Sequence, residues 1–233
     1  MKITKKKTTL GGIALGLTAL SLTAVAAPAF AHGASQTPMS RQLGCKLDGA
    51  GTWAGAKTYE TCNEAAAISG EAPFSNWQGV VQGDTRLGEK DPQWQTVFPD
   101  GQLCSGGNDS YAGLDVAGKD WPTTTLKGGA ETELTFHNTV NHNPYTFSYF
   151  VTKDGYDASK PLTWADLEET PFLVADSLES LGTNLDQGTK LPTVLPDKKG
   201  HHVIYTIWQG NIKADGAVQS NEAFVGCSDV DFE

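Results

Sequence analysis

The sequence predicts an all-β protein, a β-sandwich with a long loop and short-helix insertion, and three observations lead to this class. From about residue 130 onward, apolar and polar residues alternate in short segments, which is typical of half-buried strands. Turn-forming residues separate these segments, as they do between the strands of a sandwich. Between about residues 45 and 120 the chain is instead rich in Gly, Asp, Asn and Pro, which predicts a loop-dominated insertion.

The first 31 residues have the pattern of a secretory signal peptide. The basic start consists of Lys2, Lys5, Lys6 and Lys7. An apolar stretch follows at residues 10–25, and the small-residue site Ala29-Phe30-Ala31 comes before the expected cleavage point. This stretch is shorter than the roughly 20 residues that span a bilayer. We therefore expect a secreted, extracellular protein, with an uncleaved membrane anchor as the alternative.

Cleavage would leave residues 32–233 as a single domain of 202 residues, with no linker that marks an appended module. The net charge would change from −10 to −14, because four lysines and no acidic residue leave with the signal peptide. This acidity argues against nucleic acid or an anionic membrane as a partner and is compatible with an uncharged one. We expect a monomer.

The insertion at residues 45–120 contains scattered aromatic residues and one predicted helix, near residues 61–68. The aromatic residues are Trp53, Tyr59, Trp77 and Trp94. Loop regions of this length are uncommon in compact domains and are usually functional. The insertion is therefore a candidate for contact with a partner.

The second half of the chain supplies the predicted strands. Residues 132–137 and 145–151 alternate between apolar and polar side chains and predict two half-buried strands. Residues 163–167 predict a short helix capped by Thr163. Residues 203–208 and 223–230 are nearly continuous apolar runs, which predict two further strands.

All four cysteines lie in the exported part of the chain. An even number of cysteines in an oxidising compartment predicts two disulfides rather than thiolate metal ligands. The positions of Cys45, Cys62, Cys104 and Cys227 permit three pairings.

His32 would be the first residue of the mature protein. An amino-terminal histidine offers both its α-amine and its ring Nδ1, which can close a chelate ring around a metal, and nitrogen-rich sites suit Cu(II). A second histidine would supply a third nitrogen. His142, in a predicted turn between two strands, is the better candidate because loops commonly present ligands. For His137, His201 and His202 we expect surface or hydrogen-bonding roles.

Several short motifs then give the chain a resemblance to a known family. His32-Gly33 is followed by Pro38-Met39-Ser40-Arg41, and His142 stands ten residues before a Thr-Lys-Asp-Gly-Tyr-Asp run at 152–157. Further similar motifs are found at residues 99–105, 221–224 and 227–230. Together, in this order, they resemble the bacterial lytic polysaccharide monooxygenases of auxiliary activity family 10, over residues 32–232.

This resemblance implies a distorted fibronectin III/immunoglobulin-like β-sandwich that holds one copper ion per chain on a flat surface. His32 and His142 would form the histidine brace, with Phe224 beside the axial copper position and Glu222 close to the site. It also favours the disulfides Cys45–Cys62 and Cys104–Cys227. Val140 departs from the family pattern, in which a smaller alanine borders the axial side of the copper.

The resemblance implies a reaction in which an external electron donor and dioxygen or hydrogen peroxide support oxidative cleavage of an insoluble polysaccharide. The expected binding surface contains Tyr59, Glu60, Glu64 and Trp53. Because Cys62 is followed by Asn-Glu-Ala-Ala-Ala, we expect chitin with C1 oxidation, and keep cellulose or mixed activity as an alternative. Two other functions remain open: a non-catalytic chitin-binding protein and an exported copper carrier.

Overall fold

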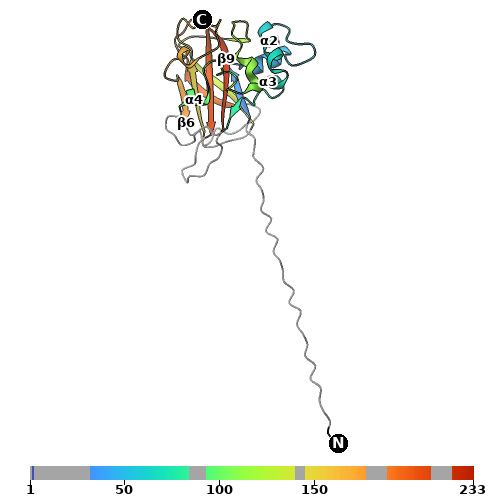
Figure 1. Ribbon diagram of the computed structural model, residues 1–233. Helices are drawn as coiled ribbons and strands as arrows, with labels where there is room; N and C mark the ends of the chain where they lie inside the picture. The colour runs from blue at the N-terminus through green and yellow to red at the C-terminus, as the bar shows by residue number, and fades with distance from the viewer. Residues whose placement is uncertain (1, 3–31, 84–92, 140–144, 177–187, 211–221) are drawn as a thin grey trace.

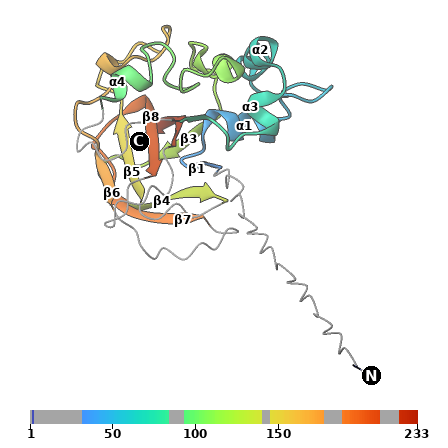
Figure 2. The same cartoon turned by 60° about the horizontal axis from the view of Figure 1, so that its bottom comes forward.

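Two β-sheets form the centre of the molecule (Figures 1 and 2). The computed structural model describes residues 2, 32–83, 93–139, 145–176, 188–210 and 222–233. The smaller sheet has the order β1 (Gly33–Thr37), β4 (Glu131–Asn138), β7 (Thr189–Val194). The larger sheet has the order β2 (Val81–Gln82), β9 (Ala223–Phe232), β8 (Gly200–Gly210), β5 (Tyr145–Val151), β6 (Leu173–Asp176), and β3 (Thr123–Leu126) pairs in parallel with β9. The predicted sandwich is confirmed.

The strand patterns follow from which faces are buried. On β4, Leu134 and Phe136 are buried in the core while the residues between them are half-buried, so the predicted alternation holds. On β8, residues on both faces are buried. One face meets the core between the two sheets, and the other meets a second apolar cluster beneath the loops and helices of the insertion. A strand covered on both faces needs no alternation, which explains the nearly continuous apolar run.

Helical segments lie along the outside of the larger sheet (Figure 1). They are α1 (Arg41–Asp48), α2 (Glu60–Ser69), α3 (Ala72–Ser75), α4 (Trp94–Val97) and the 3₁₀ segments η1 (Asp109–Asp115) and η2 (Trp164–Asp166). In Figure 1, α2 and α3 lie on one side of the sandwich and α4 on the other. The described part of the chain contains no helix whose length and apolar content would let it cross a membrane.

The prediction of one helix in the insertion is correct for α2 and wrong as a count, because α3, α4 and η1 also lie there. α1, which begins just before the insertion, was not predicted either. α1 buries Arg41, Gln42, Gly44 and Cys45, of which only the cysteine is apolar. The apolar pair in its sequence, Leu43 and Leu47, does not mark the buried face, because Leu47 is 70% exposed. The predicted helix after Thr163 is the 3₁₀ segment η2, and Thr163 and Asp166 bond reciprocally at its start.

Both expected disulfides are present. Cys45 and Cys62 join α1 to α2 inside a small apolar cluster, and Cys104 and Cys227 join the insertion to the centre of β9. The first bond lies within the insertion, and the second connects the insertion to the larger sheet. The pairing that the resemblance favoured is therefore confirmed.

Five strand ends meet at one end of the sandwich. Gly33 at the start of β1 pairs with Asn138 at the end of β4. Tyr145 at the start of β5 pairs with Gly210 at the end of β8, beside Ala223 at the start of β9. The opposite end carries Gly200 and the C-terminal residues of β9. The first end is where the candidate histidine His32 lies.

Candidate metal centre

His32 is half-buried and comes immediately before β1. Its carbonyl oxygen accepts two hydrogen bonds from Thr139, one from the backbone N–H at 2.9 Å and one from the hydroxyl at 3.2 Å. The next residue, Gly33, donates its N–H to the carbonyl oxygen of Gln78 at 2.8 Å. The backbone of His32 is thus held by the end of β4 on one side and by the insertion on the other.

Gly33 is required by close packing. A Cβ atom at this position would lie 2.5 Å from Cε1 of Phe136 and 2.9 Å from Cζ3 of Trp208. Both rings are buried and belong to the central core. His32 is therefore attached to a backbone that rests directly on two rigid aromatic side chains.

The second expected ligand, His142, and the departure at Val140 lie outside the described residues. The structure does place both flanks of this segment. Thr139 bonds to His32, and Tyr145 begins β5 at the same end of the sandwich. Within the described part of the chain, no three His, Cys, Asp or Glu side chains gather into a metal-binding group.

Phe224 and Glu222 lie at the start of β9. Phe224 is buried, pairs with Val81 of β2, and its ring lies 5.1 Å from that of Trp208. The carbonyl oxygen of Glu222 accepts a hydrogen bond from Gly210 at 3.0 Å, which closes the β8–β9 ladder. Phe224 therefore belongs to the apolar core that packs against β1. Glu222, two residues earlier, is half-buried at the edge of that core.

Residues that the sequence analysis did not assign also shape this end. The ring of Trp77 lies 5.5 Å from that of His137, whose strand position is next to Asn138. Gln78 and Thr139 hold the backbone at His32, as described above. Trp77 was noticed as an aromatic residue of the insertion, but its place beside β4 is a tertiary contact that no local pattern reports.

Of the four residues that we expected on the substrate surface, one is half-buried and three are exposed. Tyr59 is half-buried against the cluster around the Cys45–Cys62 disulfide. Glu60 and Glu64 are exposed on the first turns of α2. The side chain of Trp53 is 101% exposed, in the loop between α1 and α2. The tyrosine is thus anchored by its packing, and the tryptophan is free to contact a partner.

His202 has the hydrogen-bonding role that we expected, and His201 lies beside a buried carboxylate. Nε2 of His201 lies 3.3 Å from the Asp229 carboxylate, and Nδ1 of His202 lies 2.9 Å from the Thr152 hydroxyl. Burial lowers the pKa of His202, and the nearby Lys198 lowers it further. Both histidines lie at the start of β8, the opposite end of the sandwich from His32.

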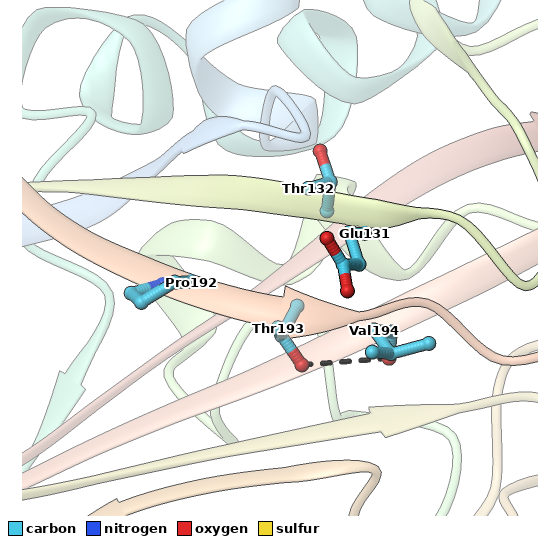
Figure 3. Close-up of a pocket in the computed structure, with 5 residues that line it drawn as sticks. All are labelled: Glu131, Thr132, Pro192, Thr193 and Val194. Carbon is cyan, nitrogen blue, oxygen red and sulfur yellow. Dashed lines mark hydrogen bonds between the residues drawn. The ribbon is translucent and has the colours of Figure 1, made fainter.

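A shallow hollow on the smaller sheet is a separate feature (Figure 3). Its volume is about 510 Å³, and it is lined by Glu131, Thr132, Pro192, Thr193 and Val194. Glu131 is the first residue of β4, and Asn138, beside His32, is the last. Asn138 comes seven positions after Glu131 along this extended strand, a rise of roughly 23 Å. The hollow is therefore distant from the candidate metal centre.

The protein is thus a β-sandwich in which backbone hydrogen bonds hold a half-buried histidine, His32, at one end of the strands. The sequence profile described as "Lytic polysaccharide mono-oxygenase, cellulose-degrading" matches residues 32–230. The chain belongs to this family, the auxiliary activity family 10 lytic polysaccharide monooxygenases. The expected resemblance is thus confirmed.

Individual relatives place the chain within the family. "Chitin-binding protein CbpD" of Pseudomonas aeruginosa is 38% identical over 88% of this chain, which spans 48% of that relative's length. A monooxygenase of Cellvibrio japonicus, described as important for efficient utilization of chitin, matches 87% of this chain and 100% of its own, with 32% identity and a TM-score of 0.69. The structure of the cellulose-active monooxygenase CelS2 in complex with copper matches 87% and 99%, with 30% identity and a TM-score of 0.66.

Proposed function

We propose that this protein is a secreted copper-dependent monooxygenase that oxidatively cleaves crystalline chitin at C1, with cellulose as the alternative substrate. One observation carries the proposal. His32 is bonded through its carbonyl oxygen to Thr139, the residue from which the chain continues toward His142. The histidine that the family resemblance pairs with His32 therefore follows this contact by three positions in the sequence.

The reach of the chain supports His142 as the partner of His32. His142 comes three positions after Thr139, and three residue steps of extended chain span at most about 11 Å. After cleavage behind Ala31, His32 would offer its α-amine and Nδ1, and His142 a third nitrogen. A donor set of three neutral nitrogens suits copper, and one ion would bind per chain. Bound copper would supply the electron transfer and the activation of the oxygen co-substrate.

The protein's own residues position and shield this site. Thr139 and Gln78 hold the backbone on either side of the bond between His32 and Gly33. Phe224 presents an apolar ring from the core, where it offers no competing ligand. Glu222, at the rim, is a candidate for orienting groups close to the copper. The two imidazoles and the α-amine must lose their protons to bind, so copper affinity falls in acid.

The substrate proposal rests on the character of α2. The residues after Cys62 lie within this helix, which begins at Glu60, and its exposed side carries the carboxylates of Glu60 and Glu64 rather than aromatic side chains. Polar groups of this kind can bond to the acetamido and hydroxyl groups of chitin, while Trp53 and Tyr59 can stack on sugar rings. The relatives named above include one linked to chitin binding, one to chitin utilization and one active on cellulose. Chitin is therefore the proposed substrate and cellulose the direct competitor.

The test is an assay of soluble products by mass spectrometry. The protein with a free His32 terminus would be incubated with β-chitin or with cellulose, in the presence of ascorbate, with and without copper. We expect C1-oxidised chitin oligosaccharides only with both copper and ascorbate. Oxidised cellulose fragments without chitin products would contradict the substrate proposal. Tight chitin binding without any oxidised product would favour a binding-only protein, and copper binding without polymer binding would favour a copper carrier.

Two variants test the ligand assignment. Replacing His32→Ala, or retaining one extra residue before His32, should remove the activity and the tight copper binding while the melting temperature of the metal-free protein stays unchanged. His137→Ala is the matched control, because this neighbouring histidine is outside the proposed ligand set. Normal activity of the extended form would disprove the role of the α-amine.

A further inference from the structure

A row of polar side chains crosses the apolar core of the sandwich. Tyr149 of β5, Thr206 of β8 and Gly226 of β9 are direct neighbours across three strands. Most residues before and after them on the same face of the sheet are apolar members of the core, namely Phe147, Val151, Ile204, Trp208 and Phe224. The exception is Ser228 of β9, which is fully buried and donates its hydroxyl to the carbonyl oxygen of Pro38 at 3.1 Å. The row is thus a polar layer within a mostly apolar face of the sheet.

The N-terminal segment adds further polar groups to this layer. The Ser35 hydroxyl adjoins that of Tyr149. A Cβ atom on Gly226 would lie 3.4 Å from Nε2 of Gln42 and 3.8 Å from Cβ of Ser40. Segment 35–42, which follows the candidate ligand His32, therefore lies directly over the row.

Polar atoms in this layer lack hydrogen-bond partners within the protein. Five such buried atoms are Oγ of Ser40, Oε1 and Nε2 of Gln42, Oη of Tyr149 and Oγ1 of Thr206. Burial raises the pKa of Tyr149, and the adjoining hydroxyls of Ser35 and Thr206 offset this effect only in part. Five unsatisfied polar atoms in one core would cost a large fraction of the stability of a domain.

We propose that this layer is a buried hydration site, in which internal water bridges the Gln42 carboxamide to the hydroxyls of Tyr149 and Thr206. Water suits this set because it contains both donors and acceptors, and a buried water commonly makes about three hydrogen bonds. The glycine at 226 keeps a side chain out of the layer at the point nearest to Gln42. The water links segment 35–42 to β5 and β8 and so helps to hold the strand that carries His32.

The direction in which Thr206→Val changes the melting temperature tests this proposal. If water satisfies the hydroxyl, its removal deprives that water of a partner, and the melting temperature should fall by about 3–8 °C. If the hydroxyl is buried dry, its replacement by a methyl group of similar shape removes an unsatisfied polar atom, and the melting temperature should stay constant or rise. A constant or raised value would overturn the proposal.

Thr152→Val is the matched control. Thr152 is also fully buried, but its hydroxyl lies 2.9 Å from Nδ1 of His202 and accepts a hydrogen bond from the N–H of Val203 at 3.1 Å. Its substitution gives the loss expected for a satisfied buried hydroxyl. A fall for Thr206→Val of similar size supports satisfaction of the Thr206 hydroxyl.

A high-resolution crystal structure of the unmodified protein separates water from direct contacts. Ordered water within hydrogen-bond distance of both Gln42 and Thr206 would support the proposal. Direct hydrogen bonds among the side chains of Ser40, Gln42, Tyr149 and Thr206, with no water between them, would overturn it even if Thr206→Val is destabilising. This measurement decides the question even if the variant fails to fold.

Discussion

The residue next to His32 determines how closely the N-terminal strand approaches the core. Gly33 rests on the rings of Phe136 and Trp208, and the space between this backbone and the rings is too small for a methyl group. Because both rings are buried and pack against each other, neither can move away at low cost. The position of His32 therefore depends on a glycine that performs no chemistry.

Gly33→Ala should displace the start of β1. We expect a loss of about 1–3 kcal/mol in the free energy of unfolding, as is typical of overpacking, and a weakened copper affinity because His32 moves. Thermal unfolding of the metal-free protein and isothermal titration with copper would measure the two effects.

Gly83→Ala is the control for this prediction, since a Cβ atom there meets nothing within 4 Å. This variant should leave both the free energy of unfolding and the copper affinity unchanged. Unchanged copper binding in Gly33→Ala would show that the backbone contact does not position the ligand.

At the scale of elements, the two disulfides connect parts of the chain with very different separations. Cys45 and Cys62 are 17 residues apart, whereas Cys104 and Cys227 are 123 residues apart. In the chain-entropy account, a cross-link stabilises more when it closes a longer loop of the unfolded chain. The bond to β9 should therefore stabilise the fold more than the bond between α1 and α2.

Paired substitutions to serine test this difference. Removing Cys104–Cys227 should cost about 4–5 kcal/mol of unfolding free energy, and removing Cys45–Cys62 about 3 kcal/mol. Chemical denaturation of the two double variants gives the comparison. A larger loss for the shorter loop would indicate that native packing around α2, rather than chain entropy, dominates.

Which elements could be predicted depended on how they bury their side chains. The strands at 132–137 and 145–151 were found because one face of each is apolar. α1 was missed because it buries an arginine and a glutamine. β1 and β7 were also missed: each is short, and neither has a continuous apolar face in its sequence. Their pairing with β4 is a long-range contact that local patterns do not encode.

At the scale of the whole molecule, one buried ion pair joins the two ends of the domain. Nε of Arg41 lies 2.6 Å from a carboxylate oxygen of Asp229, and its guanidinium stacks over Trp121. Burial disfavours the charge on Asp229, but Arg41 and His201 outweigh this effect and lower its pKa. This buried ion pair thus fixes the first helix, α1, to the last strand, β9, and each charge is compensated by the other.

Arg41→Met should leave the Asp229 carboxylate buried without its main cation. We expect a loss of about 3–5 kcal/mol near neutral pH, measured by chemical denaturation. Because the folded pKa of Asp229 is lowered, the pair stabilises the fold above the ordinary aspartate pKa, and this contribution is lost as the pH falls through the folded value. The difference between the two proteins should therefore shrink in strong acid.

Lys160→Met provides the comparison for an exposed pair. The Lys160 side chain is 76% exposed and lies 3.2 Å from Asp157, and pairs of this kind contribute little. It should change the stability by less than about 1 kcal/mol. An equally small effect of Arg41→Met would mean that Asp229 is satisfied by other groups.

The sequence by itself determined the features that are local or carried by motifs: the export signal as a prediction, the half-buried strands, α2, the family resemblance and, through it, the cysteine pairing. Only the tertiary structure decided which backbone groups hold His32, why position 33 is a glycine, how Arg41 meets Asp229 and where the polar layer crosses the core. The physical reason is that periodicity reports which face of one segment avoids water. Contacts between segments 107 and 188 residues apart, such as those of Thr139 with His32 and of Arg41 with Asp229, depend on the packing of the whole domain.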